Sequence, residues 1–459
     1  MRTPQAPRRS RPQPAIALLA TLILLIATVY GLTAISYPIS LIRQEVPIST
    51  RWIMQAVSSE FLLGDAAAMR QIVINYTRGF AGIGAHTLFG GLALTLCALQ
   101  FVAPLRRFSP RLHRVLGWSA AASIGLAMTG AMGYLWVTPA KDGPSGEPFA
   151  AALWVQSLTT LMALGLAIRS ARQRDFRTHM AWMTLLMASL MNAPMLRLEG
   201  VLVGRLLPLN GFQANAGLAV ILMPQAVWLM AWWMNRIGQL DLPLLRPRLT
   251  LSMPAMQTMA AMGTVVVVHE GILAPWGMDA LAHWRTADTL LPAMAALWAL
   301  STAALLWHLP GEGHHVQSGR PVRIRVLALM ATSAVGAWLL VTTPQAHSPV
   351  NLIGRQFYWA AYGVSTLSLA LFGLLQRQTS LALVPWRTML LINALQPGLC
   401  LPFGIALAWT GWSLSAIQTS ALTLSWAFVA WHGFASAYGL PLPGGGVRNM
   451  PTGKSCAQV

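Results

Sequence analysis

Two histidines occupy equivalent places in the sequence, each in a basic segment just before a long apolar stretch. His113 lies within the run Arg111-Leu112-His113-Arg114, and His179 follows the run RSARQRDFRT. Haem iron accepts two axial imidazoles, and membrane b-type cytochromes take them from different helices. The positive end of a helix dipole disfavours imidazolium, so a histidine at a helix start stays neutral and able to ligate iron. The pattern therefore predicts haem b iron bound by His113 and His179.

The surrounding residues fit the same chemistry. Arg111 and Arg114 flank His113 and could hold carboxylates such as haem propionates. Gly117 follows His113 by one helical turn, so the two lie on one face. The alternative is that both histidines are interfacial residues of basic connectors and contact lipid headgroups.

A third histidine lies between two glycines. Gly82, His86 and Gly90 are four residues apart and share one helix face. This face could leave room for a flat cofactor against the backbone. The alternative is close helix packing, because small residues at this spacing let neighbouring helices approach.

Composition defines the elements that must position these residues. Of the 459 residues, 55% are hydrophobic and only 9% are charged, whereas soluble domains carry about 25% charged residues. The apolar residues form blocks of the length that crosses a bilayer as a helix. We expect an all-α polytopic membrane bundle of about 12 helices, with spans near 15–36, 81–104, 115–137, 150–168, 180–203, 215–234, 253–273, 287–307, 326–343, 355–375, 388–408 and 413–436.

The formal net charge of +19 does not indicate a nucleic-acid partner. The basic residues lie in short connectors between apolar blocks, mostly those that a cytoplasmic N-terminus would place inside. This distribution predicts both termini in the cytoplasm and a membrane of the bacterial inner-membrane type, with lipid as the main partner.

The same pattern divides the chain into five parts. We expect a basic cytoplasmic N-terminus (1–14), a first span with a long outside loop (15–78) and a core of four spans (79–203). A C-terminal membrane region of about seven spans (204–437) and a disordered tail (438–459) follow. Part of the outside loop, 53–75, could form an amphipathic helix on the membrane surface.

Several of these residues carry a resemblance to a known family. The chain between about 80 and 200 resembles a bacterial membrane family catalogued as domain of unknown function 2306. Family members typically read His-Arg-x-Trp-Met at the last of the shared motifs, whereas this chain reads HMAWM there. The resemblance implies a membrane protein and no particular activity. The residues that carry it are His86, Gly90, Gln100, Phe101, Pro110 to Arg114, Gly117, Asp175, His179, Trp182, Met183 and Arg197.

A looser similarity is to the two-haem transmembrane cytochromes b, whose ligands lie on helices two apart. His113 and His179 have this spacing. His86 would need a partner on the fourth span, which has no histidine, so a second haem is not expected.

Two classes of function remain open. One is a haem b electron-transfer protein, and thus a membrane oxidoreductase if an enzyme, with quinone or another membrane carrier as partner. The other is a non-redox membrane protein, either a small-molecule transporter or an assembly factor. Pro397 and Pro402 interrupt the eleventh predicted span and would suit a transporter's discontinuous helix. The absence of a nucleotide-binding loop argues against ATP-driven chemistry.

Overall fold

A computed structural model describes residues 14–59, 61, 66–139, 146–206 and 399–411, with single positions between 215 and 230 and between 417 and 428. The described residues form helices and turns, without strands. Four of the twelve predicted spans lie wholly outside these residues, namely 253–273, 287–307, 326–343 and 355–375. Two more, 388–408 and 413–436, are described only in part, and both termini lie outside the described residues. The sixth predicted span, 215–234, is described only at scattered positions.

Five helices in the described part are long and apolar enough to cross a membrane, and each overlaps one of the first five predicted spans. They are Thr21–Ile42, Phe80–Gln100, Pro110–Val137, Phe149–Arg172 and Thr178–Leu206. The shortest has 21 residues, and a 20-residue helix is about 30 Å long, the thickness of the hydrocarbon layer. The membrane-protein prediction is thus confirmed for this part of the chain. The count of twelve and the orientation remain predictions.

Two of these spans contain breaks. The first joins helix α1 (Pro14–Ile35) to the short helix α2 (Tyr37–Ile42). The last joins α10 (Phe176–Leu190) to α11 (Asn192–Leu206) through a turn at Met191. Pro194 explains the second break, because its ring lacks an N–H and crowds the carbonyl four residues before it. The single helix predicted over 180–203 is therefore two helices.

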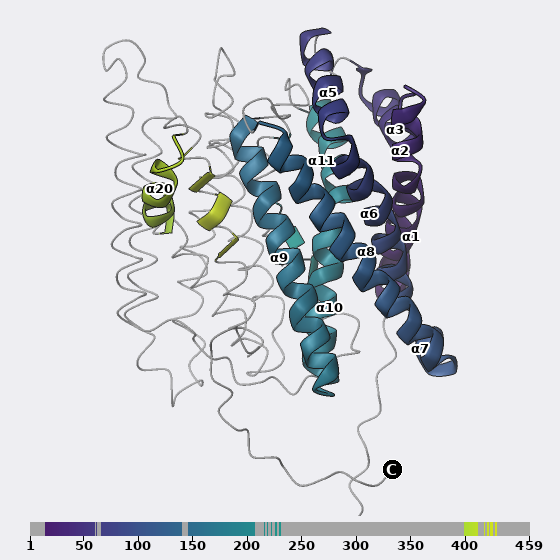
Figure 1. Ribbon diagram of the computed structural model, residues 1–459. Coiled ribbons are helices and arrows are strands. Elements are labelled where there is room, and N and C mark those ends of the chain that lie inside the picture. Colours follow the sequence, from purple (N-terminus) through teal and green to yellow (C-terminus); the bar gives the residue numbers. More distant parts are fainter. Residues whose placement is uncertain are drawn as a thin grey trace, which may run out of the picture.

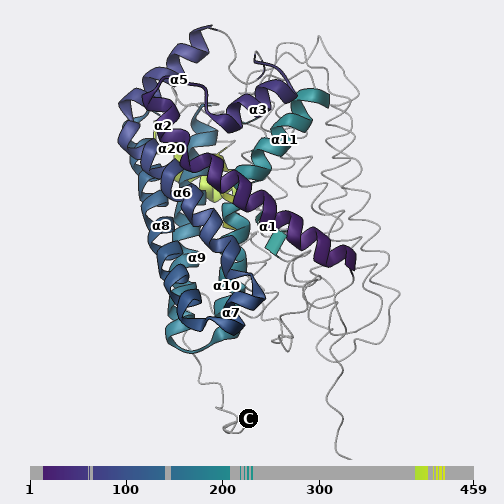
Figure 2. The ribbon, with the colours of Figure 1, turned by 90° about the vertical axis from the view of Figure 1, so that its right-hand side faces the viewer.

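The segment predicted as an outside loop is largely helical. It contains α3 (Ile48–Ala56) and α5 (Ala66–Arg78), and both lie at the same end of the bundle as α2 (Figures 1 and 2). Arg205, near the end of α11, donates from its guanidinium to the Ala56 carbonyl at the end of α3. This contact ties the segment to the end of the last described span.

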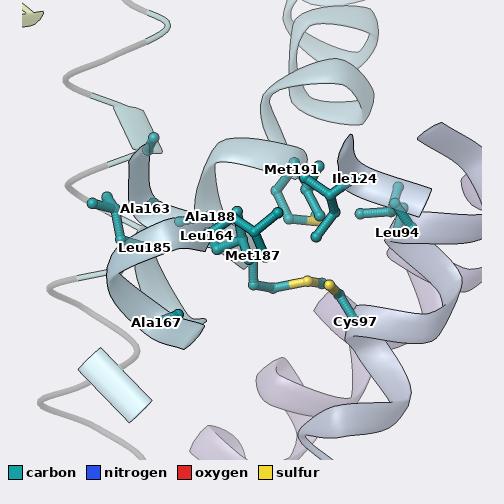
Figure 3. Packing of buried hydrophobic residues seen from close by; sticks show 14 of the residues in the cluster. Leu94, Cys97, Ile124, Ala163, Leu164, Ala167, Leu185, Met187, Ala188 and Met191 are labelled. Atoms are coloured by element: carbon teal, nitrogen blue, oxygen red, sulfur yellow. The ribbon is translucent and has the colours of Figure 1, made fainter. Parts of the chain in front are cut away.

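The core lies where α6 (Phe80–Gln100), α8 (Pro110–Val137), α9 (Gly146–Arg172) and α10 meet. Ile124, Leu185, Leu186 and Trp182 are almost completely buried there. Figure 3 shows Met187 extending toward Cys97 across this core, and the same cluster of buried residues includes Ala163, Ala167 and Ala188. A helix bundle in lipid depends on such packing, because lipid tails are as apolar as the side chains.

Close approach between helices is achieved by glycines. The backbone of Gly31 on α1 meets Gly91 on α6, where a Cβ on Gly91 would lie 2.4 Å from the Gly31 carbonyl oxygen. Only glycine fits at such a crossing. The remaining described helices are α7 (Ala103–Phe108), which connects α6 to α8, and α20 (Cys400–Ala408), which holds Pro402 in its first turn.

Candidate functional site

His113 and His179 occupy the same position in two helices. Each is the fourth residue of its helix, α8 and α10 respectively. The His113 amide donates to the Ser109 carbonyl at 3.0 Å, and the His179 amide donates to the Asp175 carbonyl at 2.9 Å. Both residues therefore belong to the first helical turn, as the sequence predicts.

The two helix starts lie at the same end of the bundle. Helix α7, which leads into α8, and the start of α10 both lie at the bottom of the two views (Figures 1 and 2). His113 and His179 lie close enough to interact electrostatically. The fold thus brings together two imidazoles that are separated by a complete span, α9.

The ring of His179 is held in one orientation. Its Nδ1 lies 2.9 Å from the Ala167 carbonyl oxygen on the preceding helix α9. A carbonyl can only accept, so the ring nitrogen must be the donor. In the neutral ring this leaves the Nε2 lone pair open, which is the arrangement that backbone carbonyls impose on metal-binding histidines.

The ring of His113 is not held in this way. Its Nδ1 is buried and has no hydrogen-bond partner. Buried polar atoms are usually hydrogen-bonded, and an unpaired one is a signal of function or of a missing ligand. His113 therefore has a ring nitrogen that a bound group could satisfy.

Arg106 is the cation associated with His113. It lies on α7, is partly buried, and interacts electrostatically with His113. Burial lowers the pKa of its guanidinium, and the charge of neighbouring Arg107 lowers it further. In addition to its contacts within the protein, a guanidinium at this position could donate to an anionic ligand. Arg106 was not predicted as a site residue, although it lies in the basic connector before α8.

The arginines selected from sequence are placed differently. Arg111 and Arg114 are both exposed on the first turn of α8. They are suited to lipid headgroups or to the outer part of a ligand. Gly117, one turn further along α8, faces Gln100, whose Oε1 would lie 3.4 Å from a Cβ at this position. The Gln100 Nε2 is buried without a hydrogen-bond partner, so a second unsatisfied polar atom lies on this side of α8.

His86 lies apart, in the contact between α6 and α8. Its Nδ1 is 3.1 Å from the Ala127 carbonyl oxygen. On the same face, a Cβ at Gly82 would lie 2.8 Å from the Gly130 carbonyl oxygen, and one at Gly90 would lie 3.9 Å from the Ala127 Cβ. The backbone of α8 fills the space at Gly82, so this geometry supports the helix-packing alternative.

Within the described part of the chain, no group of three or more histidine, cysteine, aspartate or glutamate side chains is placed to hold a metal ion. Cys97 is a buried free thiol of the core. The chemistry available near His113 is therefore that of two imidazoles, one partly buried guanidinium and one amide.

Comparison with known families gives one match. Residues 83–237 match the family described as "Predicted membrane protein (DUF2306)". This agrees with the resemblance seen in the sequence, and the looser similarity to cytochromes b is not shown. Neither curated proteins nor solved structures give a match to this chain.

Proposed function

We propose that this membrane protein binds haem b through His113 and His179 and transfers electrons to quinone or another membrane carrier. The observation that carries the proposal is the His179 ring, whose Nδ1 is held by the Ala167 carbonyl while the ring lies within electrostatic range of His113. Bis-imidazole ligation needs two imidazole rings from different helices, and His113 and His179 lie on α8 and α10.

Each residue has a definite task in this proposal. Haem, when bound, supplies reversible one-electron transfer at its iron. His113 and His179 hold the iron, and the Ala167 carbonyl orients the second of them. Arg106 donates a charge-assisted hydrogen bond to a propionate carboxylate. Such a bond is about twice as strong as one between neutral groups. Arg111 and Arg114, which are exposed, contribute less.

The proposal includes a location. We infer that the protein lies in a bacterial inner membrane. Its arginine and lysine residues are concentrated in the connectors predicted to face the cytoplasm, as the positive-inside rule requires. Arg106, Arg107, Arg111 and Arg114 all lie in or beside the connector before α8. The histidines would then lie near the cytoplasmic surface, where a carrier could exchange electrons with a soluble partner.

The absorbance of the purified protein tests the proposal. The full chain, purified in mild detergent from haem-sufficient cells, should show sharp visible bands after dithionite reduction, because two imidazoles give low-spin iron. His113→Ala and His179→Ala should each lose or alter these bands. Folded protein without them would overturn the haem proposal and favour the transporter or assembly-factor alternative.

Two arginine variants sharpen the test. Arg106→Gln should weaken haem retention roughly tenfold or more, because a hydrogen bond to a charged group contributes about 1.5–3 kcal/mol. Arg114→Gln should weaken retention less. Equal haem retention in the two variants would show that Arg106 is not part of the site. The visible absorbance bands of the histidine variants would then be the only test of ligation by His113 and His179.

A further inference from the structure

Glu199, which lies in the last described span, and Gln225 form a side-chain pair whose hydrogen bonds are incomplete. The Gln225 Nε2 donates to the Glu199 Oε1 at 2.7 Å. The other two polar atoms of the pair, Glu199 Oε2 and Gln225 Oε1, are buried and have no hydrogen-bond partner. Both are acceptors while Glu199 is ionised, so neither can satisfy the other.

A single proton on Glu199 would give both unpaired oxygens, Glu199 Oε2 and Gln225 Oε1, a hydrogen bond. A protonated carboxyl has an O–H donor at one oxygen and keeps an acceptor at the other, which makes it complementary to the donor and acceptor of an amide. We propose that Glu199 carries a proton in the folded protein and that the Glu199–Gln225 pair is a proton-binding site within the membrane. This inference is independent of the haem proposal, because it uses neither histidine.

The surroundings of Glu199 favour the neutral form. Burial removes its carboxyl from water, and no charged side chain in the described part of the chain compensates for this. An ionised carboxylate with an unpaired oxygen is costly in an apolar interior. The titratable side chains that the structure describes on α11 and on the helices packed against it make their contacts elsewhere or are exposed. They are Tyr30 on α1, Arg51 on α3, His179 on α10, and Arg197 and Arg205 on α11.

A second contact positions the amide of Gln225. Asn192, at the start of α11, donates from its Nδ2 to the Leu222 carbonyl at 2.8 Å and to the Gln156 Oε1 at 3.1 Å. Leu222 precedes Gln225 by about one helical turn. The segment that carries Gln225 is thus fixed to α11 at a buried point, and this fixes its amide beside Glu199.

The position suits proton exchange rather than structure alone. Glu199 lies seven residues before the end of α11 at Leu206 and is only partly buried. Ionisable residues inside membranes are rare and usually mark proton or substrate pathways. A carboxyl that is held by one amide, without a permanent cation beside it, can release and recover a proton as its access to water changes.

Infrared spectroscopy of the full chain in lipid vesicles tests the proposal. Near neutral pH the protein should show the C=O stretch of a protonated carboxylic acid, shifted in D₂O. Glu199→Gln should lose this band, and Glu45→Gln, at an exposed residue before α3, should retain it. Absence of the band, or its persistence in Glu199→Gln, would overturn the proposal.

A second variant keeps the test open if Glu199→Gln fails to fold. Gln225→Leu removes the acceptor for the proton, so the same band should move to higher frequency. A band that does not move would overturn the pairing. Thermal unfolding adds a separate readout. Glu199→Gln can make both hydrogen bonds to Gln225 and should unfold at the same temperature as the wild type. Glu199→Leu leaves the Gln225 amide without these hydrogen bonds and should unfold at a lower temperature. The reverse order would contradict a neutral Glu199.

Discussion

Gly82 on α6 and Gly130 on α8 pack backbone against backbone, such that a Cβ on either residue would lie 2.8 Å from the carbonyl oxygen of the other. This is closer than real Cβ atoms come to any neighbour. Both contacting atoms belong to helix backbones, which cannot move aside as a flexible side chain does. The pair therefore fixes the distance between the two helices that hold His86 and His113.

Gly130→Ala should lower the free energy of unfolding by about 1–3 kcal/mol, the usual cost of overpacking. Gly133→Ala is the matched control, because Gly133 lies on the same helix with open space around its Cβ position. The midpoint of thermal unfolding in detergent should fall for the first variant and stay level or rise slightly for the second. Equal unfolding midpoints in the two variants would show that a Cβ at Gly130 does not strain the contact between α6 and α8.

Part of this arrangement was predictable. The spacing of Gly82, His86 and Gly90 identified one face of α6, and the apolar blocks identified the first five spans to within a few residues. The sequence could not identify Gly130 as the partner, because a small residue indicates that a helix approaches closely but not which helix approaches.

The candidate site was predicted in the same partial way. His113 and His179 were found from their places before apolar blocks, since a helix start is a local signal. The orienting carbonyl of Ala167 was not predictable, because any residue supplies a carbonyl. The break at Met191 could have been predicted from Pro194, and it was overlooked because the apolar run continues through it.

The start of α10 depends on a side-chain cap that the start of α8 lacks. The Asp175 carboxylate accepts from the Thr178 amide at 3.1 Å, whereas Ser109 makes no such bond to α8. Asp175→Ala should destabilise the protein by about 0.5–2 kcal/mol, the usual cost of losing an N-cap. Ser109→Ala, at the equivalent place before His113, should change the unfolding midpoint little. A larger effect at Ser109 would contradict this assignment.

His86 is expected to act in packing rather than in cofactor retention. His86→Asn keeps a short side-chain donor for the Ala127 carbonyl and should leave expression and any visible spectrum unchanged. His86→Leu removes the donor and should cost about 0.5–1.5 kcal/mol. Loss of a cofactor from folded His86→Asn protein would instead place His86 in a binding site.

The orientation in the membrane can be tested with reporter fusions. Fusions after residues 110, 175 and 245 should report the cytoplasm, because basic residues surround these points. Fusions near 60 and 142 should report the outside. Helices α3 and α5, which come before and after residue 60 in the sequence, lie at the bundle end opposite the starts of α8 and α10 (Figure 2). A cytoplasmic signal near 60 would reverse the orientation and place His113 outside.

A buried cation at that opposite end gives the last prediction. Arg197 on α11 has tyrosines around it, because Tyr30, Tyr37 and Tyr76 all lie within electrostatic range of its guanidinium. No carboxylate is paired with it in the described part of the chain. The rings of Tyr37 and Tyr76 meet edge to face with centroids 6.4 Å apart, so α2 and α5 both help to enclose the cation. Burial raises the pKa of Tyr76, which lies on α5 outside the spans, and keeps its hydroxyl neutral.

Tyr30 has the strongest electrostatic interaction with Arg197 among these tyrosines. A double-mutant cycle of Tyr30→Phe and Arg197→Leu should therefore give a coupling free energy of about 1.5–3 kcal/mol, the size of a hydrogen bond to a charged group. Tyr76→Phe is the control partner. Tyr76 interacts less strongly with Arg197 and its ring packs on Tyr37, so its coupling to Arg197→Leu should be smaller. The free energies of unfolding of the single and double variants provide the measurement. Additive effects at Tyr30 and Arg197 would show that the buried guanidinium is stabilised by something other than this hydroxyl.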